Sequence, residues 1–359
     1  MTHADICIAG AGIIGLSLAR SLARRGVRVI VLTSGNPMLE ASFAAAGMLA
    51  VDDPDNPPEL LALSRLSRSL YTEFLNQLAE ESGQRVTFQT QRTLQIVRGA
   101  ATAEVQDHAA SNILPRLIER DEERTIALTE QSLDPRELAA ALLGAVAACG
   151  PELRTGDAVR RVQDHGGEVV VETATEKLVC GQFIDCTGAW SLSTTVSPSL
   201  RVVPRKGQML TVATPPALAR EALVVRSHEV YLVPRLHGAR AGQCVIGATV
   251  EDAGFDRAVH PTDLDDLLAR AAQRLPELCG ATVLDSWSGL RPATADLLPV
   301  LGRTTTEPRT AHLFVASGHY RNGILLAPGT AAVMTDLLLG QSPAVALEPF
   351  APDRFRARE

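Results

Sequence analysis

The chain has 359 residues, of which 46% are hydrophobic and 21% are charged, and its formal net charge is −7. This composition is ordinary for a globular protein with substantial cores, and the acidic balance argues against nucleic acid or an anionic membrane as a partner. No apolar run has the length of a membrane span, and the N-terminus lacks the basic segment of a signal peptide, so we expect a cytoplasmic protein.

The six cysteines are scattered along the chain without a C-x-x-C pair. Several lie in apolar runs, which is typical of reduced, buried thiols in a cytoplasmic protein. Their spacing predicts no metal site. They are Cys7, Cys149, Cys180, Cys186, Cys244 and Cys279.

The N-terminal segment predicts a dinucleotide-binding unit. An apolar run is followed by Gly10, Gly12 and Gly15 in the G-x-G-x-x-G spacing, then by a predicted helix over 16–25 and a strand over 27–32. The first glycine allows a tight turn, the second lets a pyrophosphate approach the backbone, and the third lets the helix pack on the sheet. The phosphates are expected at the helix N-terminus, where N–H groups are free.

The second strand ends without the acidic residue that normally binds the adenosine ribose. Thr33 and Ser34 stand at that place. A hydroxyl can bond the ribose, but without charge assistance the contact is weaker. No arginine lies beside them, so the sequence does not favour NADP.

The next segment, 41–49, contains three consecutive alanines and a glycine. It fits either a short tight helix or turn, or a backbone that lies close against a flat ligand. A proline-rich and aspartate-rich loop follows at 51–58. Apolar spacing then predicts a helix over 60–81, and a strand is expected over 93–97.

In the middle of the chain, helices are expected over 101–119 and 135–148, the second with Asp134 as its N-cap. Short strands alternate over 158–186. The glycine turn at Gly188 either approaches a cofactor or simply ends a strand.

The chain from 205 to 249 is rich in strand signals, and a helix over 263–275 and a strand over 283–290 follow. A buried strand over 313–316, a glycine loop over 317–323 and an apolar helix then form a second strand–loop–helix unit. A second helix N-terminus can therefore point at the same ligand.

This order of elements predicts an α/β fold with a mixed α+β character. We expect a Rossmann-type dinucleotide-binding domain formed by residues 1–50, 130–200 and 296–359. It is interleaved with an antiparallel-sheet substrate domain formed by 51–129 and 201–295.

Together these motifs resemble the D-amino-acid oxidase superfamily of FAD-dependent amine oxidoreductases, and within it the glycine oxidases of thiamine biosynthesis. The resemblance follows the family's order over nearly the whole chain. The segments that carry it are Gly10 to Gly15, Ala41 to Leu49, Arg205 to Gln208, Val245 to Phe255, Trp287 to Pro292 and Gly318 to Pro328.

The resemblance implies a non-covalent FAD, since covalent relatives use a cysteine late in the chain and none follows Cys279 here. It also implies a homo-oligomer, a tetramer in the family. Together with the glycine motif, it assigns the cofactor to Gly10, Gly12, Ile13, Ile14, Gly15, Thr33, Ser34, Ser42, Ala46, Gly47, Met48, Val159, Gly188, His319, Tyr320, Arg321, Asn322, Gly323, Ile324 and Leu325.

Three residues match the family's substrate site. Arg291 matches the arginine that binds the substrate carboxylate, for which a planar guanidinium is well suited. Arg321 matches a second arginine, and Tyr231 matches a tyrosine that orients the substrate. Without the resemblance, Arg291 at a strand end would more often be a surface residue, and Tyr231 a core or sheet residue.

The expected reaction is oxidative deamination of glycine, with hydride passing from the α carbon to flavin N5 and O2 reduced to hydrogen peroxide. The flavin supplies the chemistry, so no side chain is expected as a general base. The alternatives are an oxidase or dehydrogenase of sarcosine or a D-amino acid, and a flavin-binding subunit of a hetero-oligomeric amine dehydrogenase. A nicotinamide dehydrogenase is disfavoured because the alanine-rich segment would go unexplained.

Overall fold

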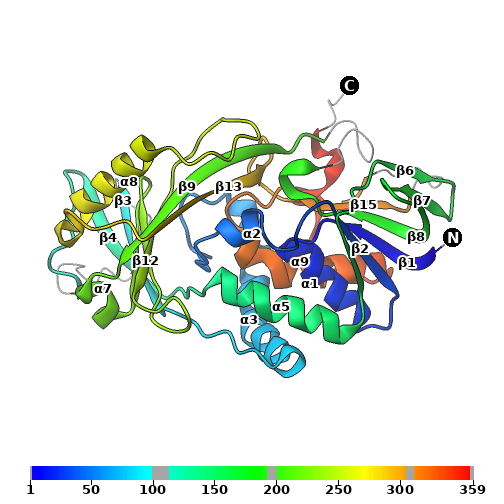
Figure 1. Cartoon of the computed structure of the whole chain (residues 1–359), viewed down its shortest axis with the longest axis horizontal. Helices are drawn as coiled ribbons and strands as arrows, with labels where there is room; N and C mark the ends of the chain where they lie inside the picture. Colours follow the sequence, from blue (N-terminus) through cyan, green and yellow to red (C-terminus); the bar gives the residue numbers. More distant parts are fainter. Residues whose placement is uncertain (1, 99–112, 192–199, 305–310, 356–359) are drawn as a thin grey trace.

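The computed structural model describes residues 2–98, 113–191, 200–304 and 311–355. Two β-sheets dominate it, lying toward opposite ends of the long axis in Figure 1. The long strands β9 (Val203–Ala213) and β13 (Asp285–Ala293) reach from the second sheet toward the first. The space between the sheets is therefore bordered by both.

The first sheet has eight strands in the described part of the chain, in the order β14-β15-β8-β1-β2-β5, with β7 also paired to β8 and β6 paired to β7. Its core strands β15, β8, β1, β2 and β5 run parallel. The strands are β1 Thr2–Ala9, β2 Val29–Thr33, β5 Glu152–Thr155, β6 Arg161–Asp164, β7 Val169–Glu172, β8 Lys177–Asp185, β14 Val300–Arg303 and β15 Leu313–Ser317.

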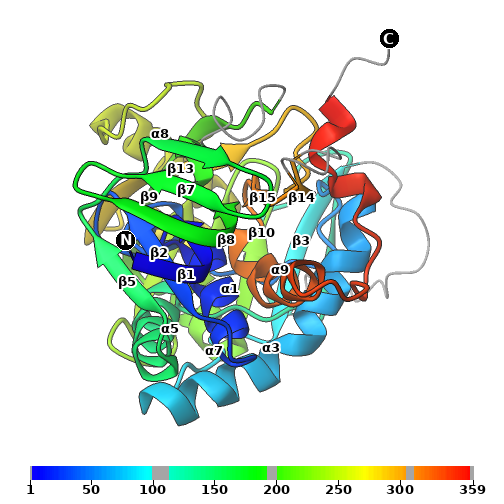
Figure 2. The ribbon, with the colours of Figure 1, turned by 90° about the vertical axis from the view of Figure 1, so that its right-hand side faces the viewer.

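Helices cover one face of this sheet. They are α1 (Ile13–Ala23), α3 (Leu61–Ser82), α5 (Pro135–Cys149) and α9 (Gly323–Leu338), and Figure 2 shows α1, α5 and α9 on the same side of β1 and β8. Successive side chains of β1 point to opposite faces of the sheet. Ile6 and Ile8 pack in the core under the helices, whereas Cys7 and Ala9 pack with β6 and β7 on the other face.

The second sheet has seven strands among the described residues, in the order β13-β9-β12-β11-β10-β3-β4. It is antiparallel except for the pair β10 and β3, which departs from the expected fully antiparallel sheet. Helix α8 (Pro261–Arg274) packs Leu267 and Ala271 against one face of it. The remaining elements are β3 Arg92–Arg98, β4 Glu123–Leu128, β10 Leu223–Arg226, β11 Tyr231–Pro234, β12 Gln243–Gly247, α2 Ala41–Ala44 and α7 Pro216–Glu221.

Helix α9 contains Pro328, which cannot donate to the carbonyl of Ile324 one turn earlier. The buried hydroxyl of Tyr71, on α3, donates to this carbonyl instead. Ser67 on the same helix donates to the Leu325 carbonyl at 2.6 Å and accepts from the N–H of Gly329 at 2.9 Å. Helix α3 therefore completes the hydrogen bonds of α9 close to the point where α9 begins.

Most of the expected elements form within a few residues of their predicted ends. Asp134 caps α5 by accepting from the N–H of Arg136 at 2.9 Å. The helix expected over 101–119 lies largely outside the described residues, and its described end, 114–119, is not helical. Strands β4 and β14 were not expected. Within the described ranges no helix has the length and hydropathy to cross a membrane, and no cluster of three or more His, Cys, Asp or Glu could hold a metal ion.

Candidate active site

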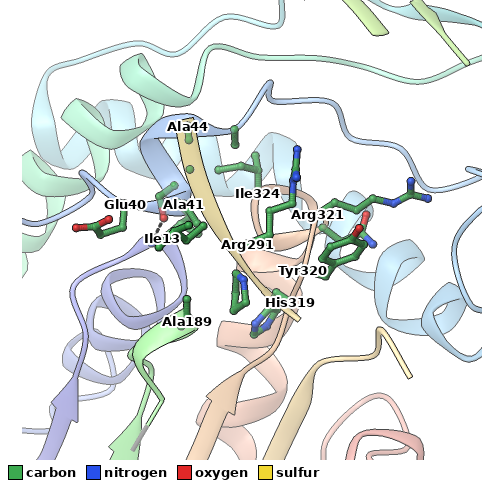
Figure 3. A pocket seen from close by; sticks show the side chains of 18 of the residues that line it. Ile13, Glu40, Ala41, Ala44, Ala189, Arg291, His319, Tyr320, Arg321 and Ile324 are labelled. Atoms are coloured by element: carbon green, nitrogen blue, oxygen red, sulfur yellow. Dashed lines mark hydrogen bonds between the residues drawn. The ribbon is translucent and has the colours of Figure 1, made fainter. Parts of the chain in front are cut away.

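A cavity of about 620 Å³ lies between the two sheets, within the size range of small-molecule and cofactor sites (Figure 3). Its walls come from the turn between β1 and α1, the end of β2, residues 40–50, strands β9 to β13 and the segment that leads into α9. Two parts of the cavity differ in construction. We call them the glycine end, formed by Gly10, Ile13, Ile14, Thr33, Ser34 and Val159, and the arginine end, formed by Tyr231, Arg291, His319, Tyr320 and Arg321.

At the glycine end, main chain packs against main chain. Gly10 has φ +104°, and a Cβ atom there would lie 2.3 Å from the carbonyl oxygen of Cys186. A Cβ atom on Gly15 would lie 2.0 Å from the carbonyl oxygen of Gly10. Only glycine allows both approaches. The first N–H of α1, on Ile13, donates to the hydroxyl of Ser42 at 2.9 Å.

Most residues predicted to bind the cofactor line this one cavity. Gly12, Gly15 and Leu325 do not line it. Gly12 is the N-cap of α1, and Leu325 is 1% exposed in the core under α9. The residues that do line it are Gly10, Ile13, Ile14, Thr33, Ser34, Ser42, Ala46, Gly47, Met48, Val159, Gly188, His319, Tyr320, Arg321, Asn322, Gly323 and Ile324.

The alanine-rich segment begins as the expected short helix, α2, and then extends along the cavity wall. Packing requires glycine on both sides of this contact region: a Cβ atom on Gly47 would lie 2.1 Å from the carbonyl oxygen of Leu133, and one on Gly289 of β13 would lie 2.3 Å from the Cβ of Ala44. The indole N–H of Trp287 donates to the Ala44 carbonyl at 3.1 Å, and Arg235 donates to the Ala46 carbonyl at 2.7 Å. The second sheet therefore holds this segment in place.

His319 precedes α9 and borders the cavity as a buried, neutral side chain. Burial lowers its pKa to about 3, so the imidazole carries no charge near neutral pH. Its Nε2 lies 3.1 Å from the hydroxyl of Thr330. His319 can therefore hydrogen-bond a ligand without adding a positive charge.

The second sheet supplies Arg291 and Tyr231 from its cavity face. Paired residues on one face of the sheet form the row Gln95, Arg226, Tyr231, Gly247, Met209 and Trp287. Arg291 lies four residues beyond Trp287 on β13, so it faces the same side. Burial raises the pKa of Tyr231, and the neighbouring Arg291 opposes that rise.

Glycines make room for both side chains. A Cβ atom on Gly207 would lie 2.2 Å from Nη2 of Arg291, and one on Gly247 would lie 2.2 Å from the hydroxyl of Tyr231. Arg291 donates to the carbonyls of Thr249 at 3.2 Å and Lys206 at 3.4 Å. Among the residues that the structure describes, no carboxylate forms an ion pair with Arg291, so its charge is available to a ligand.

Arg321 differs, because its charge is already matched. Its Nη2 lies 3.2 Å from Oδ2 of Asp53, and its Nη1 lies 3.8 Å from Oδ2 of Asp55. Figure 3 shows the Arg321 side chain extending away from Arg291. The two predicted substrate arginines border one cavity but do not converge as a pair.

Six charged residues of the cavity wall are not expected from the sequence: Glu40, Asp53, Asp55, Arg226, Glu229 and Arg257. The sequence predicts a loop or boundary over 51–58 that affects pocket volume, but it assigns none of the loop's aspartates to the site. A signal was present, since its aspartates directly follow the segment that resembles a flavin-facing one. Arg226 gave no such signal, because its position depends on the parallel pairing of β10 with β3.

Comparison with known proteins assigns the chain to a family. The FAD dependent oxidoreductase family, DAO, matches residues 5–337. A glycine oxidase of Geobacillus kaustophilus is 32% identical over 99% of this chain and 98% of its own length. The crystal structure of glycine oxidase from that organism has a TM-score of 0.89 and 30% identity, covering 99% of both chains, which confirms the predicted fold class.

A bifunctional protein ThiO/ThiG of Trichormus variabilis is 34% identical over 98% of this chain. The chain spans only 55% of that relative, or about half its length. The family match covers most of the chain, so the chain belongs to the FAD dependent oxidoreductase family, as the resemblance predicted, and FAD is its cofactor.

Proposed function

We propose that the protein catalyses the FAD-dependent oxidative deamination of glycine, giving glyoxylate, ammonia and hydrogen peroxide, in support of thiazole formation for thiamine. The observation that carries the proposal is the unpaired guanidinium of Arg291, held beside Tyr231 in the cavity. The glycine oxidases among the relatives support the choice of substrate.

Two helix N-termini at the cavity suit the phosphate groups of FAD. Helices α1 and α9 both begin at the cavity, and neither has an acidic residue in its first turn, so both N-termini keep their positive potential for phosphate groups or other acceptors. In this proposal Gly10, Ile13, Ser42 and Val159 border the nucleotide portion. Residues 319–324 face the flavin.

We propose that FAD is bound without a covalent link. Cys186 is the one cysteine among the described residues that line the cavity. Burial raises its pKa well above the usual value, so its thiol stays protonated and is a poor nucleophile. Release of intact FAD on acid precipitation tests this, and flavin retained on the denatured chain contradicts it.

In the proposed mechanism the protein positions the substrate. Arg291 binds the carboxylate through two parallel hydrogen bonds, and Tyr231 adds a third contact that fixes its orientation. The neutral His319 leaves the substrate amine free to be uncharged, as hydride loss from the α carbon requires. FAD, held at the arginine end by residues 319–324, would supply the hydride acceptor and the route of electrons to O2, and water would hydrolyse the imine product.

We also propose that the first sheet belongs to the FAD-binding domain (1–50, 130–200 and 296–359) and the second to the substrate domain (51–129 and 201–295). Helix α3 falls within 51–129 but packs with α5 and α9 over the first sheet. We further propose that the protein is a cytoplasmic homo-oligomer, and we expect a tetramer. Its size in solution can be measured by light scattering.

The direct test is to incubate the purified yellow protein with glycine, sarcosine and D-alanine and to measure peroxide and the oxo-acid product. Turnover of glycine supports the proposal. Preference for sarcosine or D-alanine favours the alternative oxidases. Absence of turnover with all three, in protein that contains FAD, contradicts an amino-acid oxidase and favours a flavin-binding subunit.

A further inference from the structure

The loop after the alanine-rich segment brings two carboxylates to the arginine end of the cavity. Asp53 is only 8% exposed, although aspartate is seldom buried without a partner. It lies 3.2 Å from Arg321 and 3.8 Å from Arg226, and its Oδ1 accepts from the N–H of Asp55 at 3.0 Å. Asp53 therefore joins an arginine of strand β10 in the second sheet to an arginine of the loop that leads into α9.

Other contacts fix this loop where it is. The side chain of Asn322, at the start of α9, donates to the side-chain oxygen of Asn56 at 2.9 Å. Asn56 in turn donates to the carbonyl of Ala50 at 3.2 Å. Arg226 also lies 3.0 Å from Glu130, so its charge is matched as well. The loop is anchored at its ends and its middle, which keeps Asp53 against Arg321.

The local charges leave one unmatched guanidinium in this part of the cavity. Arg226 and Arg321 face the carboxylates of Asp53, Asp55 and Glu130, whereas Arg291 faces none among the described residues. A second anionic group on a substrate would have to displace Asp53 from Arg321. Asp53 is attached to the same chain and already positioned, so a free ligand competes with it poorly.

We infer that Asp53, supported by Asp55, is a specificity-determining residue that occupies Arg321 and so restricts the site to amines with a single carboxylate. This inference deepens the proposed function and rests on it. Discrimination arises from repulsion of the wrong substrate as well as attraction of the right one. An amine with a second carboxylate would place that group beside Asp53 and Asp55 instead of a free cation.

The test compares sarcosine with iminodiacetate, which has the same secondary amine and one additional carboxylate. We measure kcat/KM for both with the wild-type holoenzyme, Asp53→Asn and the control Asp52→Asn. Asp52 is exposed, does not line the cavity and carries the same charge one residue earlier. Asp55→Asn is a second variant in a more exposed position, useful if Asp53→Asn folds poorly.

Asp53→Asn should raise the ratio of iminodiacetate to sarcosine kcat/KM by about tenfold or more, because it frees Arg321 and removes a like charge. Asp55→Asn should shift the ratio in the same direction by a smaller factor. Asp52→Asn should leave it within about twofold of wild type. An unchanged ratio in Asp53→Asn, or an equal rise in the control, overturns the inference.

A binding experiment separates this inference from the proposed function. Methoxyacetate and diglycolate are unreactive counterparts with one and two carboxylates, and their dissociation constants can be read from the flavin absorbance of the holoenzyme. A wild-type enzyme that turns over no amine contradicts the proposed function, yet Asp53→Asn should still tighten diglycolate relative to methoxyacetate. If Asp53→Asn does not tighten the binding of diglycolate relative to methoxyacetate, the role inferred for Asp53 is wrong, whichever amine the enzyme oxidises.

Discussion

The two ends of the cavity use glycine for different purposes. At the glycine end, Gly10 and Gly15 let one stretch of main chain approach another, and no charged side chain is needed. At the arginine end, Gly207 and Gly247 make space for the side chains of Arg291 and Tyr231. In the function proposed above, the first arrangement binds FAD through backbone N–H groups and the second binds the substrate through side chains.

This difference predicts which glycine substitutions will destabilise the fold and which will affect only ligand binding. A Cβ atom that meets a backbone carbonyl must move the main chain, whereas one that meets a guanidinium moves only a flexible side chain. Glycine substitutions at the two ends should therefore have separable effects on stability and on turnover.

The largest effect is expected for Gly10→Ala. The new Cβ would lie 2.3 Å from the Cys186 carbonyl, at a φ of +104° that alanine rarely adopts, so we expect a loss above about 3 kcal/mol in the free energy of unfolding. Thermal melting and FAD content measure it. Gly26→Ala is the control: its φ is +80°, nothing lies within 4 Å, and about 1–2 kcal/mol is expected. If Gly10→Ala and Gly26→Ala lose the same free energy of unfolding, the close approach of residue 10 to the Cys186 carbonyl is not the cause of the loss.

The arginine end is tested next by Arg291→Ala. Loss of the carboxylate partner should lower kcat/KM for glycine by roughly 30- to 5000-fold, equivalent to about 2–5 kcal/mol, with the flavin spectrum intact. Arg291→Lys should fall between wild type and alanine, because it restores the charge but not the planar fork.

A matched control is available for Arg291 on the neighbouring strand. Arg205 pairs with Arg291 in the sheet register, but it does not line the cavity and forms an ion pair with Asp252 at 2.9 Å. Arg205→Ala should retain nearly full activity. Full glycine activity in Arg291→Ala would instead show that another group binds the carboxylate.

Gly207→Ala sharpens the comparison directly. Its Cβ would meet the end of the Arg291 side chain, so the protein should fold and bind FAD while Arg291 is displaced. We expect kcat/KM to fall about 10- to 100-fold, the size of a misplacement of the order of 1 Å. If Gly207→Ala lowers the melting temperature as much as Gly10→Ala does, glycine substitutions at the arginine end also damage the fold, and the two ends do not differ in their effect on stability.

The last prediction concerns the pH dependence of stability at His319, an effect that is absent at neutral pH and grows only as the pH falls. Its pKa is about 3 in the folded protein and near 6.5 in the unfolded chain, so between these values only the unfolded chain binds the proton. Stability is therefore full above pH 6.5 and falls as the pH decreases, by up to about 1.4 kcal/mol per pH unit.

Replacing His319 by Gln should flatten this decline. Melting temperatures of the FAD-saturated wild type and His319→Gln, measured between pH 4 and pH 8, should diverge as the pH falls, with wild type declining more steeply. The other seven histidines are common to both proteins, so the difference isolates His319. Parallel curves would show that the side chain is protonated without penalty.

The sequence by itself determined the local units of this protein. The glycine spacing at 10–15, the apolar helices and the second strand–loop–helix unit near 317–324 all follow from neighbouring residues, because turn chemistry and side-chain periodicity act over short spans. The resemblance, also present in the sequence, pointed to FAD and to Arg291, Arg321 and Tyr231.

The tertiary structure decided which charges remain free. Nothing near Arg321 in the sequence shows that Asp53 takes its charge, and nothing near Arg291 shows that Gly207 lets it lie against a neighbouring strand. Strand β3 also joins β10 in parallel, which places Gln95 beside Arg226. Such pairings depend on the path of the whole chain, because segments far apart in sequence meet only after both sheets have formed.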